Sequence, residues 1–227
     1  MALPFRRSAW VRAAPFAAFM AVLALRGVAP ADGSWGFDVR WLYAAQALLP
    51  AALLALWWRE YGELSYQTLP TGREALWAVA VGLLVFGLWV HLDAPWMTLD
   101  IATSEAFVPR DASGALQWPL IAVRTAGAAL LVPVMEELFW RSFLMRWLQA
   151  PLFEAVPPQR VALRAVVLST FVFVLAHTLW LAAALAGLAY AALYIRSGKL
   201  WLAVIAHAVT NAALGVWVVA TGSWQFW

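Results

Sequence analysis

Residues 116–148 read LQWPLIAVRTAGAALLVPVMEELFWRSFLMRWL, a stretch that is apolar along most of its length. It exceeds the roughly 20 apolar residues that one helix needs to cross a bilayer. The whole chain has the same character, with 65% apolar and 12% charged residues, whereas a soluble domain carries about 25% charged residues. A chain of 227 residues cannot hide so much apolar surface from water. The composition therefore predicts a membrane protein.

Further apolar stretches at residues 10–28, 39–58, 74–92, 161–179, 180–195 and 200–220 are each a candidate membrane span. We therefore expect an all-α fold, a polytopic transmembrane bundle of about seven helices (six to eight) in a single domain over residues 1–227. Pro133 predicts a kink within 116–148, followed by an amphipathic extension along the cytoplasmic interface. A tight turn near Trp180 must separate 161–179 from 180–195.

The distribution of charged residues predicts the topology. With the N-terminus in the cytoplasm, eleven of the fifteen Lys and Arg fall on the cytoplasmic side, as the positive-inside rule requires. Seven crossings then place the C-terminus outside, in a multi-pass protein of the inner (plasma) membrane. The cytoplasmic set is Arg6, Arg7, Arg12, Arg59, Arg73, Arg141, Arg146, Arg160, Arg164, Arg196 and Lys199; the outer side holds Arg26, Arg40, Arg110 and Arg124 with Asp32, Asp38, Asp93, Asp100, Glu105 and Asp111.

Composition also narrows the partners. The net charge of +3 comes from scattered basic residues, so we expect the lipid bilayer as a partner and no nucleic acid. The chain has no cysteine, which excludes disulfides and thiolate metal sites.

Ionisable groups inside apolar runs are the informative residues of a membrane protein, because each is costly there without a partner. Glu136 and Glu137 are adjacent, so they cannot share one helix face. Glu137 and Arg141 are four residues apart and are expected to pair. A surface ion pair at a helix end explains those two residues but leaves Glu136 without a reason, which favours a functional role for Glu136.

Two later segments carry further polar side chains. His177 follows the apolar run Phe171–Ala176, and His207 and Asn211 lie four residues apart in the last helix. Each has a structural alternative: His177 could bond a backbone carbonyl, and His207 with Asn211 could bridge packed helices. Taken together, a carboxylate, two histidines and an amide from three helices are the groups needed to hydrolyse an amide bond. A poorly solvated carboxylate acts as general base toward water, and His and Asn donate to an oxyanion.

Other functions use the same residues. Glu136, His177 and His207 could bind zinc with water in the fourth position, although a His-Glu-x-x-His motif is absent. An ion- or proton-coupled transporter would use them as a relay, but the internal repeats common in transporters are not seen. A non-catalytic membrane scaffold is the third reading. The residues alone leave these alternatives open.

The three segments resemble the signature of the CAAX prenyl protease and bacteriocin-processing family, also called the Abi family. Its pattern is Glu-Glu-x-x-x-Arg, Phe-x-x-x-His and His-x-x-x-Asn, each on its own transmembrane helix. This sequence has Glu136-Glu137-Leu138-Phe139-Trp140-Arg141, Phe173-Val174-Leu175-Ala176-His177 and His207-Ala208-Val209-Thr210-Asn211, in the same order and spacing. The signature covers about residues 120–220, within the catalytic helices expected at about 116–220.

The resemblance implies an intramembrane endopeptidase that acts on a membrane-associated protein or peptide. Glu136 would activate water with help from His177, while His207 and Asn211 would form the oxyanion hole. Glu137, Arg141 and Phe173 would support the site. The resemblance favours a glutamate-dependent enzyme with no cofactor, and zinc is the alternative. Prenylated substrates do not transfer, since bacteria generally lack the prenylation step.

The run Val132–Arg141 and the ending Thr221–Trp227 also look like a bacterial branch that is described as CAAX prenyl protease-related. Some members of that branch accompany exosortase protein-sorting systems, which would be a functional partner here. One requirement follows for the fold. Because a straight helix over 161–179 would place His177 far deeper than His207, a later helix start near Val167, a tilt or a re-entrant turn at 177–181 is needed to bring them together.

Overall fold

The computed structural model describes residues 6–30, 34–99 and 106–227, and within them the chain is helical with no strand beyond a single bridge between Arg110 and Leu116. Asp32, Asp100 and Glu105, which the sequence assigns to the outer side, lie outside the described residues. The helices are α1 (Arg7–Val28), α2 (Leu42–Leu56), α3 (Gly72–His91), α4 (Trp118–Ala126), α5 (Val132–Glu137), α6 (Met145–Trp147), α7 (Leu163–Leu175), α8 (Trp180–Ser197) and α9 (Leu200–Thr221).

Two π-helical segments, η6 (Gly127–Leu131) and η7 (Leu138–Leu144), join α4, α5 and α6 into one continuous helix. Counting that helix once, the described residues form the bundle of seven that the composition predicts, and six of its members are long and apolar enough to span a membrane. Next to Pro133 the hydrogen-bond register of the long helix changes, because the π-helical η6 ends directly before α5.

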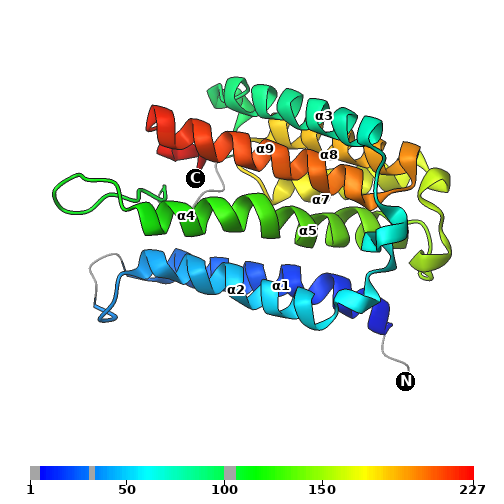
Figure 1. Cartoon of the computed structure of the whole chain (residues 1–227), viewed down its shortest axis with the longest axis horizontal. Helices are drawn as coiled ribbons and strands as arrows, with labels where there is room; N and C mark the ends of the chain where they lie inside the picture. The colour runs from blue at the N-terminus through cyan, green and yellow to red at the C-terminus, as the bar shows by residue number, and fades with distance from the viewer. Residues whose placement is uncertain (1–5, 31–33, 100–105) are drawn as a thin grey trace.

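The long helix α4–α6 runs through the middle of the bundle (Figure 1). The α1–α2 hairpin packs on one side of it, and α3, α8 and α9 lie on the other (Figure 1). The start of α1 and the C-terminus lie at opposite ends of the bundle (Figure 1).

Small residues bring the helices close together, as is common in membrane bundles. A Cβ added at Gly82 of α3 would collide with the carbonyl oxygen of Ala206 and would lie 2.8 Å from Cβ of Val209, both on α9. Gly187 of α8 similarly faces Thr170 of α7, where an added Cβ would lie 2.9 Å from Cγ2. Both glycines are therefore needed for the observed packing.

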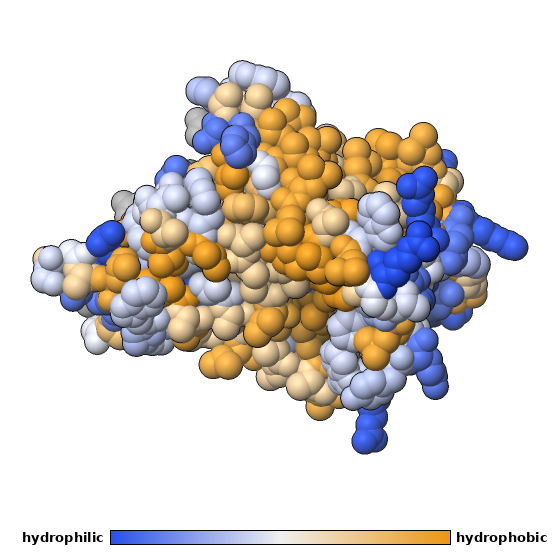
Figure 2. All heavy atoms as spheres, turned by 45° about the horizontal axis from the view of Figure 1, so that its top comes forward, coloured by the Kyte–Doolittle hydropathy of each residue, from blue (hydrophilic) through white to orange (hydrophobic). Residues whose placement is uncertain are grey.

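Large apolar side chains cover the outside of the bundle. Leu48, Leu56, Leu76, Leu130 and Val216 are each more than two-thirds exposed in the isolated chain. Figure 2 shows such residues as a broad apolar region across the middle of the molecule, with hydrophilic residues gathered toward both ends. Exposing this apolar surface to water would be unfavourable in free energy. The hydrocarbon of a bilayer is therefore its solvent.

The second half of the long helix differs from the expectation. Ser142, Phe143 and Arg146 are buried within the protein rather than lying along an interface. Arg12 of α1 forms an ion pair of 2.6 Å with Glu63, which also bonds to the Ser142 hydroxyl. These contacts hold the second half of the helix inside the bundle, so the predicted amphipathic extension is wrong.

Candidate active site

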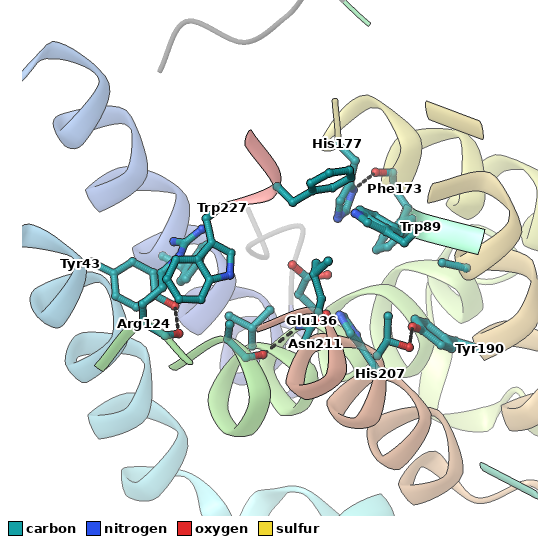
Figure 3. A pocket seen from close by; sticks show the side chains of 17 residues that line it. Tyr43, Trp89, Arg124, Glu136, Phe173, His177, Tyr190, His207, Asn211 and Trp227 are labelled. Carbon is teal, nitrogen blue, oxygen red and sulfur yellow. Dashed lines mark hydrogen bonds between the residues drawn. The ribbon is translucent and has the colours of Figure 1, made fainter. Parts of the chain in front are cut away.

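The bundle contains a cavity of about 200 Å³ beside α5 and α9. Every residue that the sequence assigns a catalytic role lines it: Glu136, His177, His207 and Asn211, together with the supporting Phe173. Figure 3 shows Glu136 between His177 and His207. The remaining lining residues are Phe19, Tyr43, Trp89, Arg124, Ala128, Val132, Ala186, Tyr190, Thr210, Leu214, Phe226 and Trp227.

The two adjacent glutamates point to different surroundings. Glu136 lines the cavity, is 8% exposed, and accepts a hydrogen bond of 3.3 Å from the indole N–H of Trp140. Glu137 is fully buried and pairs with Arg141 at 3.0 Å, which confirms the predicted pair. The π-helical segments on both sides of α5 alter the usual helical spacing, and such segments often occur at functional sites.

Glu137 links α5 to α9. Its Oε1 accepts from Arg141 Nη1 at 3.0 Å and from His207 Nδ1 at 2.9 Å, while Oε2 is buried without a partner in the described structure. Arg141 also donates to the Gly187 carbonyl at 3.3 Å, and its guanidinium lies 4.7 Å from the Phe173 ring centroid. The fully buried Glu137 therefore orients one of the two histidines of the cavity.

His177 reaches the cavity because α7 is short. Its 13 residues extend about 20 Å at 1.5 Å per residue, less than the roughly 30 Å of a bilayer core. The chain turns back between the end of α7 and Trp180, which confirms the predicted turn. A hydrogen bond of 2.7 Å from the backbone N–H of Leu99 to the Thr178 carbonyl anchors it.

The hydrogen bonds of the histidines fix their proton positions. Nδ1 of His177 lies 2.7 Å from the Phe173 carbonyl oxygen, which can only accept, so Nδ1 carries the proton and neutral His177 has an accepting Nε2. Nδ1 of His207 likewise donates to Glu137. In neutral His207, Nε2 is therefore a hydrogen-bond acceptor. In the imidazolium form Nε2–H is a donor, and the Glu137 carboxylate lies beside the added positive charge.

Two neighbours hold the α9 side chains in place. The Tyr190 ring stacks on His207 with centroids 5.0 Å apart, and its hydroxyl lies 2.7 Å from the Thr210 hydroxyl. Asn211 donates through Nδ2 to the Ala128 carbonyl at 2.8 Å. Since a primary amide has two N–H groups, one of them remains for the cavity.

The possible metal ligands of the cavity are Glu136, His177 and His207, whose chemistry would allow zinc. Within residues 6–30, 34–99 and 106–227, no three His, Cys, Asp or Glu side chains are placed so that they could hold a metal ion.

The sequence interpretation missed Arg124, Tyr43, Trp89 and Tyr190 as lining residues. Arg124 was counted with the charges of the outer side, yet it lies within the candidate span Trp118–Trp147. The rule that an ionisable residue inside an apolar run marks a site would have identified it. The three aromatic residues carry no comparable signal, because aromatic residues make up 15% of the chain.

Comparison with known families gives one match. Residues 117–213 match the family model described as Type II CAAX prenyl endopeptidase Rce1-like. The matched region begins just before α4 and ends within α9, so it contains all four cavity residues to which the sequence assigns a catalytic role. No curated protein and no solved structure matches the chain.

Proposed function

Residues 117–213 match the model of a family of CAAX-type membrane endopeptidases, and from that match we propose that the chain hydrolyses a peptide bond with water activated by Glu136. The match supplies the reaction class, a protease acting on membrane-associated substrates. The assignment of roles to single residues rests on the cavity. The observation that carries it is that Glu136, His177 and His207 line one cavity from three separate segments.

The first step is the attack of water on the scissile carbonyl carbon. Glu136 removes a proton from the water as general base. His177 helps to orient that water through its Nε2, which accepts a hydrogen bond because Nδ1–H is engaged with the Phe173 carbonyl. The oxygen of the water forms the new bond to carbon, and the carbonyl oxygen becomes an oxyanion.

Two donors stabilise that oxyanion. His207 in its imidazolium form donates through Nε2–H, while Nδ1–H stays on Glu137. Asn211 donates through the N–H that it does not use on the Ala128 carbonyl. Loss of one such donor in other enzymes costs about 10²–10³ in rate. Collapse of the intermediate breaks the C–N bond, and Glu136 returns its proton to the departing amine.

The predicted topology remains part of the proposal. We place the N-terminus in the cytoplasm, because the basic residues concentrate in the connections at the end of the bundle where α1 begins. Since the chain has no cysteine, a single cysteine introduced at Arg59 or at Arg110 reports its side by labelling with an impermeant maleimide. Labelling of the Arg59→Cys variant from outside intact cells would show that the orientation is the reverse of the proposed one.

Cleavage of peptides by the pure protein tests the proposed chemistry. Wild type and Glu136→Gln are reconstituted in liposomes and incubated with a peptide library of randomised apolar sequence, and the products are identified by mass spectrometry. The proposal predicts peptide-bond hydrolysis by the wild type alone. Equal cleavage by Glu136→Gln, with both proteins folded, would show that Glu136 is not the general base.

A further inference from the structure

A pair of arginines lies at the side of the cavity away from the two histidines. Arg124 lines the cavity from α4, and Figure 3 shows it beside Tyr43 and Trp227. Its guanidinium carbon lies 4.5 Å from the ring centroid of Tyr43 and 5.5 Å from that of Phe107. Arg26 of α1 approaches the same two rings, at 5.4 Å and 5.8 Å. Two positive charges therefore share one pair of aromatic rings.

No described carboxylate balances these charges. Among the residues that the structure describes, neither arginine takes part in an ion pair, whereas Arg7, Arg12, Arg40 and Arg141 each have an acidic partner. Arg26 donates to the amide oxygen of Gln46 at 2.7 Å. Nε of Arg124 is buried with no hydrogen-bond partner.

A buried arginine without an acidic partner lowers the stability of the fold unless a ligand binds it. Burying a charged side chain in a membrane protein is costly, so such residues are usually paired or functional. Aromatic faces offset part of the cost, but the buried Nε–H of Arg124 is left without a partner. A guanidinium is suited to an anion, because its N–H groups match the two oxygens of a carboxylate or phosphate.

The position of Arg124 relative to Glu136 limits the ligand. The two residues lie twelve positions apart on the same continuous helix, about 18 Å along its axis at 1.5 Å per residue. An extended peptide covers about 3.3 Å per residue, so this distance corresponds to about five residues. A peptide held at Glu136 can therefore reach Arg124 within the same cavity.

We propose that Arg124 is a specificity residue of this site, whose guanidinium binds a carboxylate of the peptide substrate within about five residues of the scissile bond. The carboxylate comes from an acidic side chain or from the end of the substrate chain. Arg26, which lies against the same Tyr43 and Phe107 rings, adds positive potential. This inference rests on the proposed endopeptidase function.

The cavity favours a peptide over a phospholipid as the source of the anion. It joins Arg124 to Glu136, as a contact with a substrate held at Glu136 requires.

Three peptide libraries of the same randomised apolar sequence test the proposal: one ends in a free carboxylate, one in an amide, and one in an amide with a single Asp within five residues of that end. Each is incubated with the full chain in nanodiscs of neutral lipid, and retained peptides and products are quantified by mass spectrometry. We expect the wild type to retain one carboxylate form at least about tenfold over the plain amide, the effect of a charge-assisted hydrogen bond. Which carboxylate form is preferred identifies the source.

Variants separate this inference from the proposed chemistry. Arg124→Gln should lose the preference, Arg124→Lys should keep part of it, and Arg110→Gln, which alters an exposed arginine outside the cavity, should keep all of it. Glu136→Gln should retain the preference in binding while cleaving nothing. Selective retention without cleavage by the wild type would defeat the proposed function and leave this inference standing.

Three results would overturn the inference. The first is equal retention of all three libraries by the wild type, or retention of none of them. This result is obtained with the wild type alone, so it does not depend on the folding of any variant. The second is a carboxylate preference that survives in folded Arg124→Gln. The third is Arg124-dependent retention of an anionic phospholipid with no preference among the peptides, which would assign the arginines to a lipid.

Discussion

The side-chain amide of Asn211 donates to the carbonyl oxygen of Ala128 at 2.8 Å. This carbonyl is the one that Pro133 leaves free. In η6 the N–H of Val132 bonds to the Gly127 carbonyl, a step of five residues, and the next donor in that register would be residue 133. Proline has no N–H, so Asn211 of α9 supplies the missing hydrogen bond and fixes its own position in the cavity.

Replacing Asn211 should therefore affect both stability and activity. Asn211→Leu removes the donor and leaves the Ala128 carbonyl unsatisfied, which should lower the free energy of unfolding by about 1–3 kcal/mol. The same change removes an oxyanion donor, so cleavage should fall by about 10²–10³. Denaturant titration in detergent and peptide cleavage measure the two effects. A variant with unchanged stability would show that the bond to Ala128 contributes nothing.

Glu137 should be more important for folding than Glu136. Glu137→Leu leaves Arg141 buried without its partner, a change that typically costs about 3–5 kcal/mol. Adding Arg141→Met removes the unpaired charge and should restore much of the stability, since apolar replacement of a buried pair is often nearly neutral. Denaturant titration of both variants tests this. Equal stability of Glu137→Leu and the wild type would contradict the structure.

Gly82 and Gly87 form a matched pair on α3. A Cβ at Gly82 would collide with the backbone of α9, whereas one at Gly87 would meet nothing within 4 Å. Gly82→Ala should push the helices apart and lower the free energy of unfolding by about 1–3 kcal/mol, while Gly87→Ala should be neutral or stabilising because it favours the helix. Thermal unfolding of the two variants compares them directly, and equal melting temperatures would refute the close packing.

Metal removal distinguishes the glutamate mechanism from the zinc alternative. Since no three ligands in the described part of the chain are placed for a metal, cleavage should survive dialysis against a strong chelator, with less than one equivalent of zinc in the active sample. Activity that disappears with the metal and returns on adding zinc, but not magnesium, would instead favour Glu136, His177 and His207 as ligands.

The sequence was sufficient for the class of fold because the bilayer imposes a simple length rule on apolar helices. It also identified the Glu137–Arg141 pair, because spacing within one helix is fixed. It could not place His177 next to His207, since that depends on where α7 ends and on the contact between Leu99 and Thr178.

Other features depend on distant segments in the same way. The bond from Asn211 to Ala128 does not follow from local pattern, since it forms only when α9 packs on the long helix. The sequence prediction also did not include the π-helical segments around α5. The interface extension expected after Pro133 was wrong for this reason: Arg12 and Glu63, more than seventy positions earlier in the chain, hold that segment inside the bundle.

The most direct test of the central claim is a quantitative map of protein termini in source-cell membranes. Wild type is compared with Glu136→Gln and with Glu154→Gln, which alters an exposed carboxylate outside the cavity, all at matched expression. The account predicts new termini in membrane-associated proteins with the wild type and with Glu154→Gln, and their loss with Glu136→Gln. The same termini in all three strains, with every variant folded and abundant, would contradict it.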